Sequence, residues 1–376
     1  MIRHLHIVCL DVPWPADYGG AIDMMNRIMM LKKMGISIHL HYFSYNERGT
    51  PNELNQYCDS INVYKRKKGH KGFSAKLPYI VASRMNDELV TNLRGDNYPI
   101  LLEGLHCTGV LPQLDLNNRK VVVRMHNEES IYYKELARSE TSFFKKLYFL
   151  HESKLIKKYN HQLPSACTYA CISAEDIRLL NNEYHLPNTK FLPAYPAWQQ
   201  VTGEEGIGNL CLYHGNLSVP ENEEAAIWLL RKVFNNVRKP FVIAGKKPSK
   251  RLEKLAHLYQ HTCLVADPTE SELNDLIRKA HINVLPCFNK NITGLRLKLL
   301  HALFEGRHCV VNEPMVKGTG LEGACHTGTT ANAFASIIAQ LYHQPFTNEE
   351  ITLRKKLLGD TYDNEKNTRQ LIQYLY

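Results

Sequence analysis

Long apolar runs are missing from the sequence. The longest, such as residues 225–230, stop far short of the roughly 20 apolar residues that a membrane-spanning helix needs. The first eleven residues form a short strand-like run and lack the apolar core and small-residue cleavage site of a secretory signal. These absences exclude a helical membrane protein and lead us to expect a protein that stays in the cytoplasm.

Cysteine pairs with metal-binding spacing, solenoid repeats and low-complexity tracts are also missing. None of the ten cysteines forms a C-x-x-C pair, and the closest two, Cys167 and Cys171, are expected to be buried thiols rather than ligands. We therefore expect a reducing compartment and no structural metal.

What is present is the composition of an ordinary globular protein. Of 376 residues, 44% are apolar and 22% charged, which excludes collagen-like, disulfide-scaffold and wholly disordered chains. Lysine and arginine outnumber aspartate and glutamate by 46 to 37, for a formal charge of +9. The length suggests two or three domains of roughly 100–200 residues.

Short β-branched or apolar runs alternate with longer stretches of helical period, as in βα units around parallel sheets. The runs before residue 200 are 5–10, 37–43, 61–65, 99–102, 120–125, 168–172 and 190–192, and those after it are 210–213, 241–244, 262–265, 282–285 and 309–311. Residues 198–208 have no apolar periodicity and resemble a linker. The sequence thus predicts an α/β protein with two doubly wound parallel-sheet domains that face a cleft.

Ligands of such sheets bind beyond the carboxyl ends of the strands. After the first strand, Gly19 and Gly20 open a helix, where backbone N–H groups can approach a phosphate; a plain turn is the alternative. His126 follows the fifth strand, where its imidazole has either a structural or a chemical role.

The second domain offers two glycine turns. Gly215 and Asn216 follow its first strand and present bare backbone to the cleft. Ser218 and Glu221 have the spacing of a capping box, so helix initiation explains part of this pattern. The next strand ends before Lys246, which either meets an anion or belongs to a solvated basic turn.

The densest feature is the segment 291–306. Its apolar stripe consists of Leu295, Leu299, Ala302 and Leu303, and another face carries Lys298, His301 and Glu305. If residues 293–294 open this helix toward the cleft, its N-terminus and Arg296 or Lys298 can neutralise a diphosphate. The alternative is a core helix with a solvated stripe.

Basic residues also gather at 65–71, followed by Phe73, and on a predicted helix between Lys145 and Lys158 that carries Phe144 and Leu147. Such surfaces attract anionic membranes or nucleic acid, although a plain solvated face is the alternative. Because the chain carries no nucleic-acid fold signature, an anionic membrane surface is the partner that we expect.

Five motifs in their order along the chain resemble the landmarks of family 4 glycosyltransferases. They are Pro13-x-Pro15 with Gly19-Gly20, His126-Asn127-x-Glu129-Ser130, Gly215-Asn216-Leu217 before Pro220-x-Asn222, Ala244-Gly245-Lys246, and Gly294-Leu295-Arg296-Leu297-Lys298 before Gly306. The resemblance covers nearly the whole chain. It implies the GT-B fold, with two Rossmann-like domains facing a cleft.

The resemblance also implies an organisation and an activity. Residues 1–200 would form the acceptor domain, residues 201–355 the nucleotide-sugar donor domain, and residues 356–376 a terminal helix that packs back on the first domain. The expected enzyme is a metal-independent retaining glycosyltransferase that moves a sugar from a nucleotide-diphosphate sugar to a glycan or lipid-linked acceptor, without a further cofactor. Bacterial relatives often build cell-surface polysaccharides at the inner face of the membrane.

Site roles follow from the same resemblance. The residues expected to be catalytic are His126, Arg296 and Lys298, and those expected to bind the donor are Gly19, Gly20, Gly215, Asn216, Lys246, Thr293, Gly294, Leu295 and His301. His126 would contact the transferring sugar. Because a leaving diphosphate gains negative charge as the glycosidic bond breaks, preplaced cations and N–H groups lower the barrier and can replace a metal ion.

One departure from the family pattern concerns its Glu-x7-Glu motif, whose carboxylates would stand at positions 293 and 301. This chain has Thr293 and His301 there. The second Glu accepts hydrogen bonds from both ribose hydroxyls, which an imidazole with one acceptor nitrogen cannot copy. The departure favours an alternative, a non-catalytic GT-B protein that binds a glycan or a partner enzyme; another GT-B chemistry, such as nucleotide-sugar epimerisation, fits the motif order less well.

Overall fold

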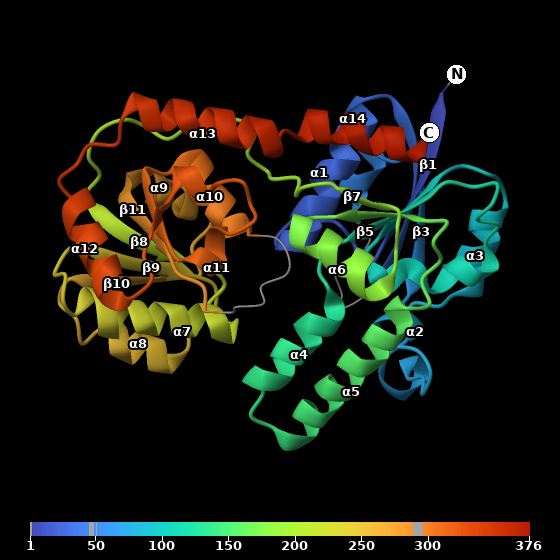
Figure 1. Cartoon of the computed structure of the whole chain (residues 1–376), viewed down its shortest axis with the longest axis horizontal. Coiled ribbons are helices and arrows are strands. Elements are labelled where there is room, and N and C mark those ends of the chain that lie inside the picture. The colour runs from blue at the N-terminus through green and yellow to red at the C-terminus, as the bar shows by residue number, and fades with distance from the viewer. Residues whose placement is uncertain (1, 45–48, 50, 289–295) are drawn as a thin grey trace. The chain divides into compact units, whose positions relative to one another are not determined.

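The computed structural model describes residues 2–44, 49, 51–288 and 296–376 (Figure 1). These residues form two compact units, one from the residues up to 197 together with 362–376, the other from the residues between 198 and 361. The boundaries expected from the sequence, near 200 and 355, differ from these by a few residues. None of the described helices is both long and apolar enough to cross a membrane.

The first unit is built on a parallel sheet that has seven strands among the described residues, in the order β3-β2-β1-β4-β5-β6-β7. The strands are β1 (Arg3–Cys9), β2 (Ile36–Ser44), β3 (Ser60–Lys65), β4 (Ile100–Glu103), β5 (Val121–Met125), β6 (Thr168–Cys171) and β7 (Thr189–Phe191). Its helices are α1 (Gly19–Lys33), α2 (Tyr79–Ala82), α3 (Asp87–Arg94), α4 (Glu129–Ser139), α5 (Phe143–Asn160), α6 (Ala174–Tyr184) and α14 (Asn364–Leu375), with 3-10 helices η1 (Asn52–Gln56), η2 (Gly69–Gly72) and η3 (Leu105–Gln113).

The second unit repeats this plan with six strands in its described part, in the order β10-β9-β8-β11-β12-β13. They are β8 (Leu210–His214), β9 (Phe241–Gly245), β10 (Thr262–Ala266), β11 (Ala280–Leu285), β12 (His308–Val311) and β13 (His326–Thr327). Its helices are α7 (Pro220–Trp228), α8 (Lys250–Ala256), α9 (Glu270–Lys279), α10 (Leu297–Glu305), α11 (Glu313–Val316), α12 (Ala331–Leu341) and α13 (Asn348–Thr361), with the π-helix η4 (Leu229–Phe234) and the 3-10 helix η5 (Glu322–Ala324).

The predicted α/β class with doubly wound parallel sheets is confirmed, and each strand expected from the sequence is present. One core of the first unit contains α1 and α14 residues, such as Met24 and Leu371, and the other contains α5 and α6 residues, such as Ile156 and Leu180. Helices therefore cover both faces of the sheet, which explains why its strands are apolar on both sides. The short strand β13 was not expected because it has no apolar run.

One local expectation was wrong, and one alternative is excluded. Ser218 does not cap the helix after β8: α7 starts from Val219 without a side-chain cap, and the Ser218 hydroxyl donates to Asn216 Oδ1 instead. His301 and Glu305 are not part of a solvated stripe, because both are buried within α10. This face of α10 therefore points into the second unit and not into solvent.

Strand order determines where ligands can bind. In each unit the order of connections reverses once, between β1 and β4 in the first and between β8 and β11 in the second. At such a switch point the loops beyond the carboxyl ends of the two strands diverge and leave room for a ligand. Both clusters described next stand at the carboxyl ends of these strands or their neighbours.

Candidate functional site

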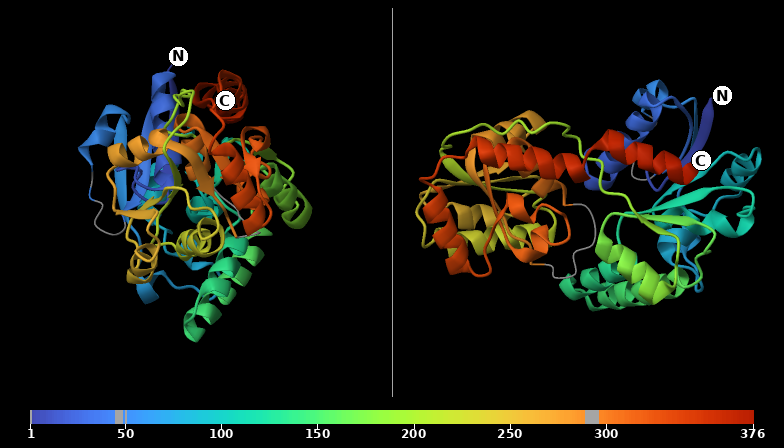
Figure 2. Two further views of the ribbon diagram at one scale, coloured as in Figure 1. Left: turned by 90° about the vertical axis from the view of Figure 1, so that its left-hand side faces the viewer. Right: turned by 45° about the horizontal axis from the view of Figure 1, so that its top comes forward.

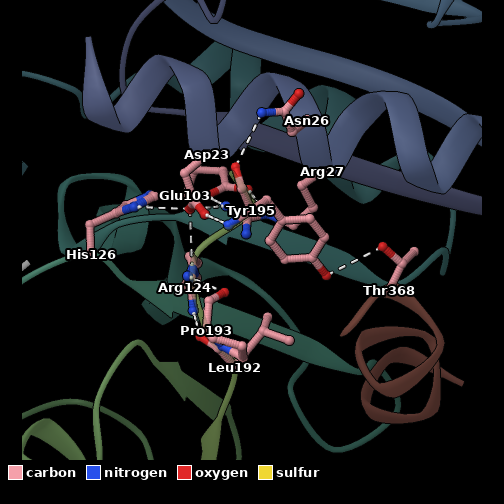
Figure 3. Close-up of polar contacts among 10 residues, drawn as sticks. All are labelled: Asp23, Asn26, Arg27, Glu103, Arg124, His126, Leu192, Pro193, Tyr195 and Thr368. Carbon is pink, nitrogen blue, oxygen red and sulfur yellow. Dashed lines mark hydrogen bonds and ion pairs between the residues drawn. The ribbon is translucent and has the colours of Figure 1, made fainter. Parts of the chain in front are cut away.

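The first unit holds a buried cluster of charged side chains at the carboxyl ends of β4 and β5 (Figure 3). Helix α1 supplies Asp23 and Arg27, one turn apart, and β4 ends in Glu103. Arg27 donates from Nη2 to Asp23 Oδ2 at 2.6 Å and from Nε to Glu103 Oε1 at 2.8 Å. Arg124, near the end of β5, lies with Nε 3.4 Å from Asp23 Oδ2. We call these four residues with His126 the unit-1 cluster.

The charges of this cluster balance without the histidine. Two carboxylates face two guanidinium groups, and Arg124 also donates to the carbonyls of Leu192 and Pro193. Burial alone would raise the pKa of Asp23, but the neighbouring Arg27 and Arg124 outweigh it and lower that pKa. The pKa of Glu103 is lowered for the same reason, with Arg27 and His126 overcoming burial. Both carboxylates are therefore ionised at neutral pH.

His126 lies between the two carboxylates. Its Nε2 is 3.0 Å from Glu103 Oε2 and its Nδ1 is 3.5 Å from Asp23 Oδ2. Gly104 follows β4 beside the ring, and its φ of 93° is a conformation that favours glycine. The imidazole is thus held in one orientation at the edge of the sheet, as a group that binds or protonates substrate must be.

Other expected residues of the first unit stand nearby in the chain. Helix α1 begins at Gly19, its N-cap Tyr18 provides no side-chain cap, and no acidic residue occupies its first turn. A Cβ at Gly20 would lie 3.1 Å from Tyr18 Cε2. Glu129, three residues after His126, is buried, and burial raises its pKa to about 7. It is therefore a carboxyl group able to exchange a proton near neutral pH.

The second unit contains a partly buried lysine, Lys298, on α10. Its Nζ donates to Asn222 Oδ1 at 2.7 Å and lies 5.4 Å from the ring centre of Tyr213. Among the described residues, no carboxylate oxygen lies within 4 Å of this ammonium group. Burial lowers the pKa of Lys298 to about 8, because water no longer solvates its charge. The position therefore suits an anionic ligand.

Glycine turns surround this lysine's partner. Asn222 donates to the carbonyl of Asn216 at 2.9 Å, and its side chain lies 3.5 Å from where a Cβ of Gly215 would stand. A Cβ at Gly245 would lie only 1.9 Å from the Gly215 carbonyl oxygen, so no larger residue fits between the ends of β8 and β9. Lys246 follows with an exposed side chain, and its carbonyl accepts from Leu217 N at 2.9 Å.

His301 is built into an aromatic contact. Its ring stacks on Trp198 with centroids 4.1 Å apart and meets the His214 ring edge-on at 5.7 Å. Its Nε2 lies 3.7 Å from Glu305 Oε2. Burial lowers the pKa of His214 well below its usual value, an effect that His301 and Lys298 increase. Position 301 thus connects to the lysine site through a neutral histidine.

The structure brings some of the expected residues together. Gly215, Asn216 and Lys298 share Asn222 as a neighbour, and His301 joins them through His214. Arg296 is the N-cap of α10 and donates to the Lys317 carbonyl at 2.9 Å. Thr293, Gly294 and Leu295 lie outside the described residues.

Sequence reasoning missed the partners of His126. Asp23 and Arg27 lie one turn apart on α1, but Glu103 and Arg124 come from β4 and β5, so no spacing relates these three elements to one another. One signal was available: charged residues in the apolar strands β4 and β5, Glu103 and Arg124, require partners when both faces of a sheet are covered. Glu129 belongs to the motif His126-Asn127-x-Glu129-Ser130, but the motif by itself assigns it no role.

Two groups of side chains in the described part of the chain could supply three metal ligands each. One is Asp23, Glu103 and His126, and the other is His308, His326 and Glu350. In the first, Arg27 and Arg124 already neutralise the carboxylates, so a divalent ion would add uncompensated positive charge. The second begins at the first residue of β12, at the opposite end of the sheet from the glycine turns.

Comparisons with known proteins agree with this architecture. No family model matches the chain. A Klebsiella pneumoniae protein described as "Uncharacterized 44.6 kDa protein in cps region" is 26% identical over 332 residues, which cover 84% of each chain. The solved structure of a mutant of S. aureus TarM in complex with fondaparinux, alpha-GlcNAc-glycerol and UDP is similar with a TM-score of 0.67, at 10% identity over 100% of both chains.

A second solved structure has the same fold. The UDP-forming alpha,alpha-trehalose-phosphate synthase from Burkholderia xenovorans, in complex with glucose-6-phosphate, is similar with a TM-score of 0.63, at 10% identity over 100% of both chains. The chain therefore has the GT-B fold, with two Rossmann-like domains.

Proposed function

We propose that this GT-B protein is a glycosyltransferase that uses a nucleotide-diphosphate sugar. The observation that carries the proposal is Lys298, a partly buried ammonium group held by a neutral amide beside two glycine turns. A partly desolvated cation that makes no close ion pair among the described residues is costly, although the charge of Glu221 offsets part of that cost, and a bound diphosphate would relieve more of it. The same contact would strengthen as the diphosphate leaves, because the departing group gains negative charge.

The unit-1 cluster supports a second role in the same reaction. His126 is fixed between Glu103 and Asp23, in a network whose charges already cancel. His126 Nε2 is already hydrogen-bonded to Glu103, so Nδ1, which makes no hydrogen bond to the described residues, is the nitrogen that would hold a hydroxyl of the transferring sugar. The raised pKa of Glu129 offers a group close in the chain that exchanges protons near pH 7. We assign His126 to the sugar and Lys298, with Gly215 and Asn216, to the diphosphate.

Finer features of the reaction are part of this proposal. Retention of anomeric configuration is supported by the resemblance of the motifs to family 4. Metal independence is supported by Lys298, because a fixed cation can take the place of a divalent ion at the leaving group. Arg296 and Lys246 would add to the positive charge, and Gly19 and Gly20 would bring backbone N–H groups to the donor or acceptor.

The acceptor and the setting are also proposed. The relative from a cps region supports a role in cell-surface polysaccharide synthesis, with a glycan or lipid-linked glycan as acceptor. TarM, which shares the fold, was solved with UDP and a GlcNAc-glycerol. Ten free cysteines, most of them buried, support a reducing environment, and we propose action at the inner face of the membrane.

The test is a titration of the protein with UDP, GDP, ADP, TDP and CMP. Binding is measured by calorimetry, and the melting temperature by thermal shift. One nucleoside diphosphate should bind and raise the melting temperature, because a ligand of the native state stabilises it. Lys298→Met should abolish this binding, whereas the matched control Lys254→Met, at an exposed lysine of α8, should retain it. A wild-type protein that binds none of the five contradicts the proposal.

A non-catalytic GT-B protein is the second candidate, and His301 favours it. Trp198 stacks on the ring at the position where the family pattern has the ribose-binding carboxylate. If the donor site no longer binds nucleotides, the protein will bind a glycan without binding any nucleotide. Glycan-array binding in the absence of nucleotide affinity would therefore select this candidate over the enzyme.

A further inference from the structure

Helices α4 and α5 form a hairpin that extends away from the sheet of the first unit (Figures 1 and 2). Hydrogen bonds at its base join the two helices to each other and to α6. Glu128 accepts from Asn160 Nδ2 at 2.9 Å and from the Tyr184 hydroxyl at 2.8 Å, and Ser153 Oγ donates to the Ser130 carbonyl at 2.7 Å. The hairpin is thus held at its base to the unit that carries His126.

The outer end of the hairpin is apolar and exposed. Residues 143–148, the first six of α5, are all exposed, and the buried residues of this helix begin at Glu152. The exposed fractions are 67% for Phe143, 82% for Phe144 and 49% for Leu147. Large apolar side chains rarely stand exposed together in a monomeric protein unless they mark an interaction site.

The charge around these side chains is positive. Helix α5 carries five lysines, and its one acidic residue, Glu152, is buried and accepts from Tyr79 N at 2.8 Å. That contact places the 65–79 segment beside α5, so the exposed lysines of 65–71 and Phe73, which is 58% exposed, extend the same surface. Acidic side chains offset part of this charge, since Glu135 pairs with Arg138, Lys157 pairs with Glu183, and Glu140 lies in the turn between the helices. The excess that an anionic partner would meet is at the tip lysines and the 65–71 segment.

The order of residues at the tip distinguishes a bilayer from a protein partner. At about 100° per residue, Phe143, Leu147, Phe144 and Tyr148 fill an arc of about 140° around the helix axis. Lys146 and Lys145 stand on the two flanks of that arc. This is the arrangement of a helix at a lipid interface, where aromatic side chains enter the acyl boundary and flanking lysines reach the phosphates.

We propose that the tip of the α4–α5 hairpin docks the protein on an anionic lipid bilayer. The docking surface consists of Phe143, Phe144, Lys145, Lys146, Leu147 and Tyr148, and the basic 65–71 segment adds electrostatic attraction. The proposal rests on the proposed function in one respect, since docking would bring the acceptor unit to a lipid-linked substrate. Docking itself needs no turnover.

The experiment is flotation of the full-length chain with vesicles of phosphatidylcholine alone or with 30% phosphatidylglycerol. Wild type should float with the anionic vesicles and much less with the neutral ones. The variant F143S/F144S/L147S should lose at least tenfold in partitioning, and K145E/K146E should lose a similar factor and its dependence on salt. The control Leu258→Ser, at a 76% exposed leucine of the second unit, should float like wild type.

Three outcomes would overturn the proposal. Wild type could fail to float, the serine variant could float as wild type does, or wild type could form lipid-free oligomers that the serine variant lacks, which would make a second copy the occupant of the surface. The melting temperature and nucleotide titration of each variant are measured in parallel. Unchanged nucleotide binding with lost flotation separates membrane docking from donor binding, so either proposal can fail alone.

Discussion

At the scale of single residues, Lys298 and His126 show two opposite electrostatic situations. Lys298 is a partly buried cation whose hydrogen-bond partner, Asn222, is neutral. His126 adds an imidazole to four charges that already cancel. Lys298 should therefore lower the stability of the ligand-free protein and favour an anionic ligand. His126 should be replaceable without loss of the fold.

Lys298 makes the pH dependence of diphosphate binding predictable. Its pKa of about 8 is lower than the usual value, so its charge is lost as pH rises through 8 unless an anion is bound. We expect diphosphate affinity to fall about tenfold between pH 7 and pH 9, because one proton is taken up on binding in that range. Isothermal titration at several pH values measures this, and a flat wild-type profile would contradict it.

Replacement of Lys298 should raise the stability of the protein and lower its activity. Lys298→Met removes a desolvated charge, so we expect the ligand-free protein to gain on the order of 1 kcal/mol, while kcat falls about 10²-fold. Thermal unfolding and initial rates of transfer provide the two readouts. An unchanged rate would remove Lys298 from the mechanism, and Lys254→Met should alter neither quantity.

The unit-1 cluster predicts a difference between two alanine variants. His126→Ala leaves the charges of Asp23, Glu103, Arg27 and Arg124 balanced, so the melting temperature should fall by only a few degrees while kcat falls about 10²-fold. Glu103→Ala leaves a buried cation in excess and should cost about 3 kcal/mol or more of unfolding free energy. Circular dichroism and kinetics check both, and a fully active His126→Ala would contradict the assigned role.

At the scale of secondary-structure elements, side chains of β1 and β2 belong to a chain of hydrogen bonds in which each group has a fixed role as donor or acceptor. Asn92 Nδ2 donates to the Tyr64 hydroxyl, which lies 2.9 Å from His41 Nδ1. His41 Nε2 is 2.9 Å from His6 Nδ1, and His6 Nε2 is 3.0 Å from Asp96 Oδ2. Every donor in this chain of hydrogen bonds finds an acceptor only if both histidines are neutral.

This chain of hydrogen bonds predicts acid sensitivity. Burial, followed by the charges of His6 and His39, lowers the pKa of His41 to about 3. Because the unfolded chain binds the proton near pH 6.5 and the folded chain does not, stability is complete above pH 6.5 and decreases as pH falls toward 3. At pH 5 the loss from His41 should be about 2 kcal/mol.

Urea unfolding at pH 7.5, 6.5, 5.5 and 5.0 measures this loss. The variant His41→Met is less stable at neutral pH because Tyr64 and His6 lose a partner. Its unfolding should take up about one proton fewer between pH 6.5 and 5, so its free energy of unfolding should change less with pH. His257→Met, at an exposed histidine, should retain the wild-type slope. Parallel profiles for wild type and His41→Met would show that His41 does not carry the effect.

At the scale of the whole molecule, the chain leaves the first unit, forms the second and returns to the first through α14. Leu371 and Leu375 of this helix are fully buried with Met24 and Ile28 of α1. The stability of the first unit therefore depends on the last residues of the sequence. This dependence is a property of the path of the chain and not of either sheet alone.

Differential scanning calorimetry should reveal this dependence. In Leu371→Ala/Leu375→Ala, two cavities form in the core of the first unit, and we expect a loss of about 4 kcal/mol or more in that unit. The transition that nucleotide binding shifts, which belongs to the second unit, should move much less. A single transition that shifts as a whole would mean that the two units unfold together.

The sequence by itself determined the elements and their order. Alternating apolar runs predicted the twelve longer strands, because a strand covered on both faces must be apolar along its length. Glycines at the ends of β8 and β9 were identified as candidates from the sequence, and the structure shows that Gly245 admits no Cβ, because one would lie 1.9 Å from the Gly215 carbonyl oxygen. His126 and Lys298 were named because they follow strands or lie on a helix at the expected place.

Only the tertiary structure decided what surrounds those residues. Asp23, Glu103 and Arg124 meet His126 from α1, β4 and β5, and Trp198 meets His301 from the segment before β8. Contacts between residues so far apart in the chain leave no period or spacing that a sequence pattern can reveal. Whether a charge is buried, paired or free to meet a ligand is fixed by packing, and packing is a property of the folded chain.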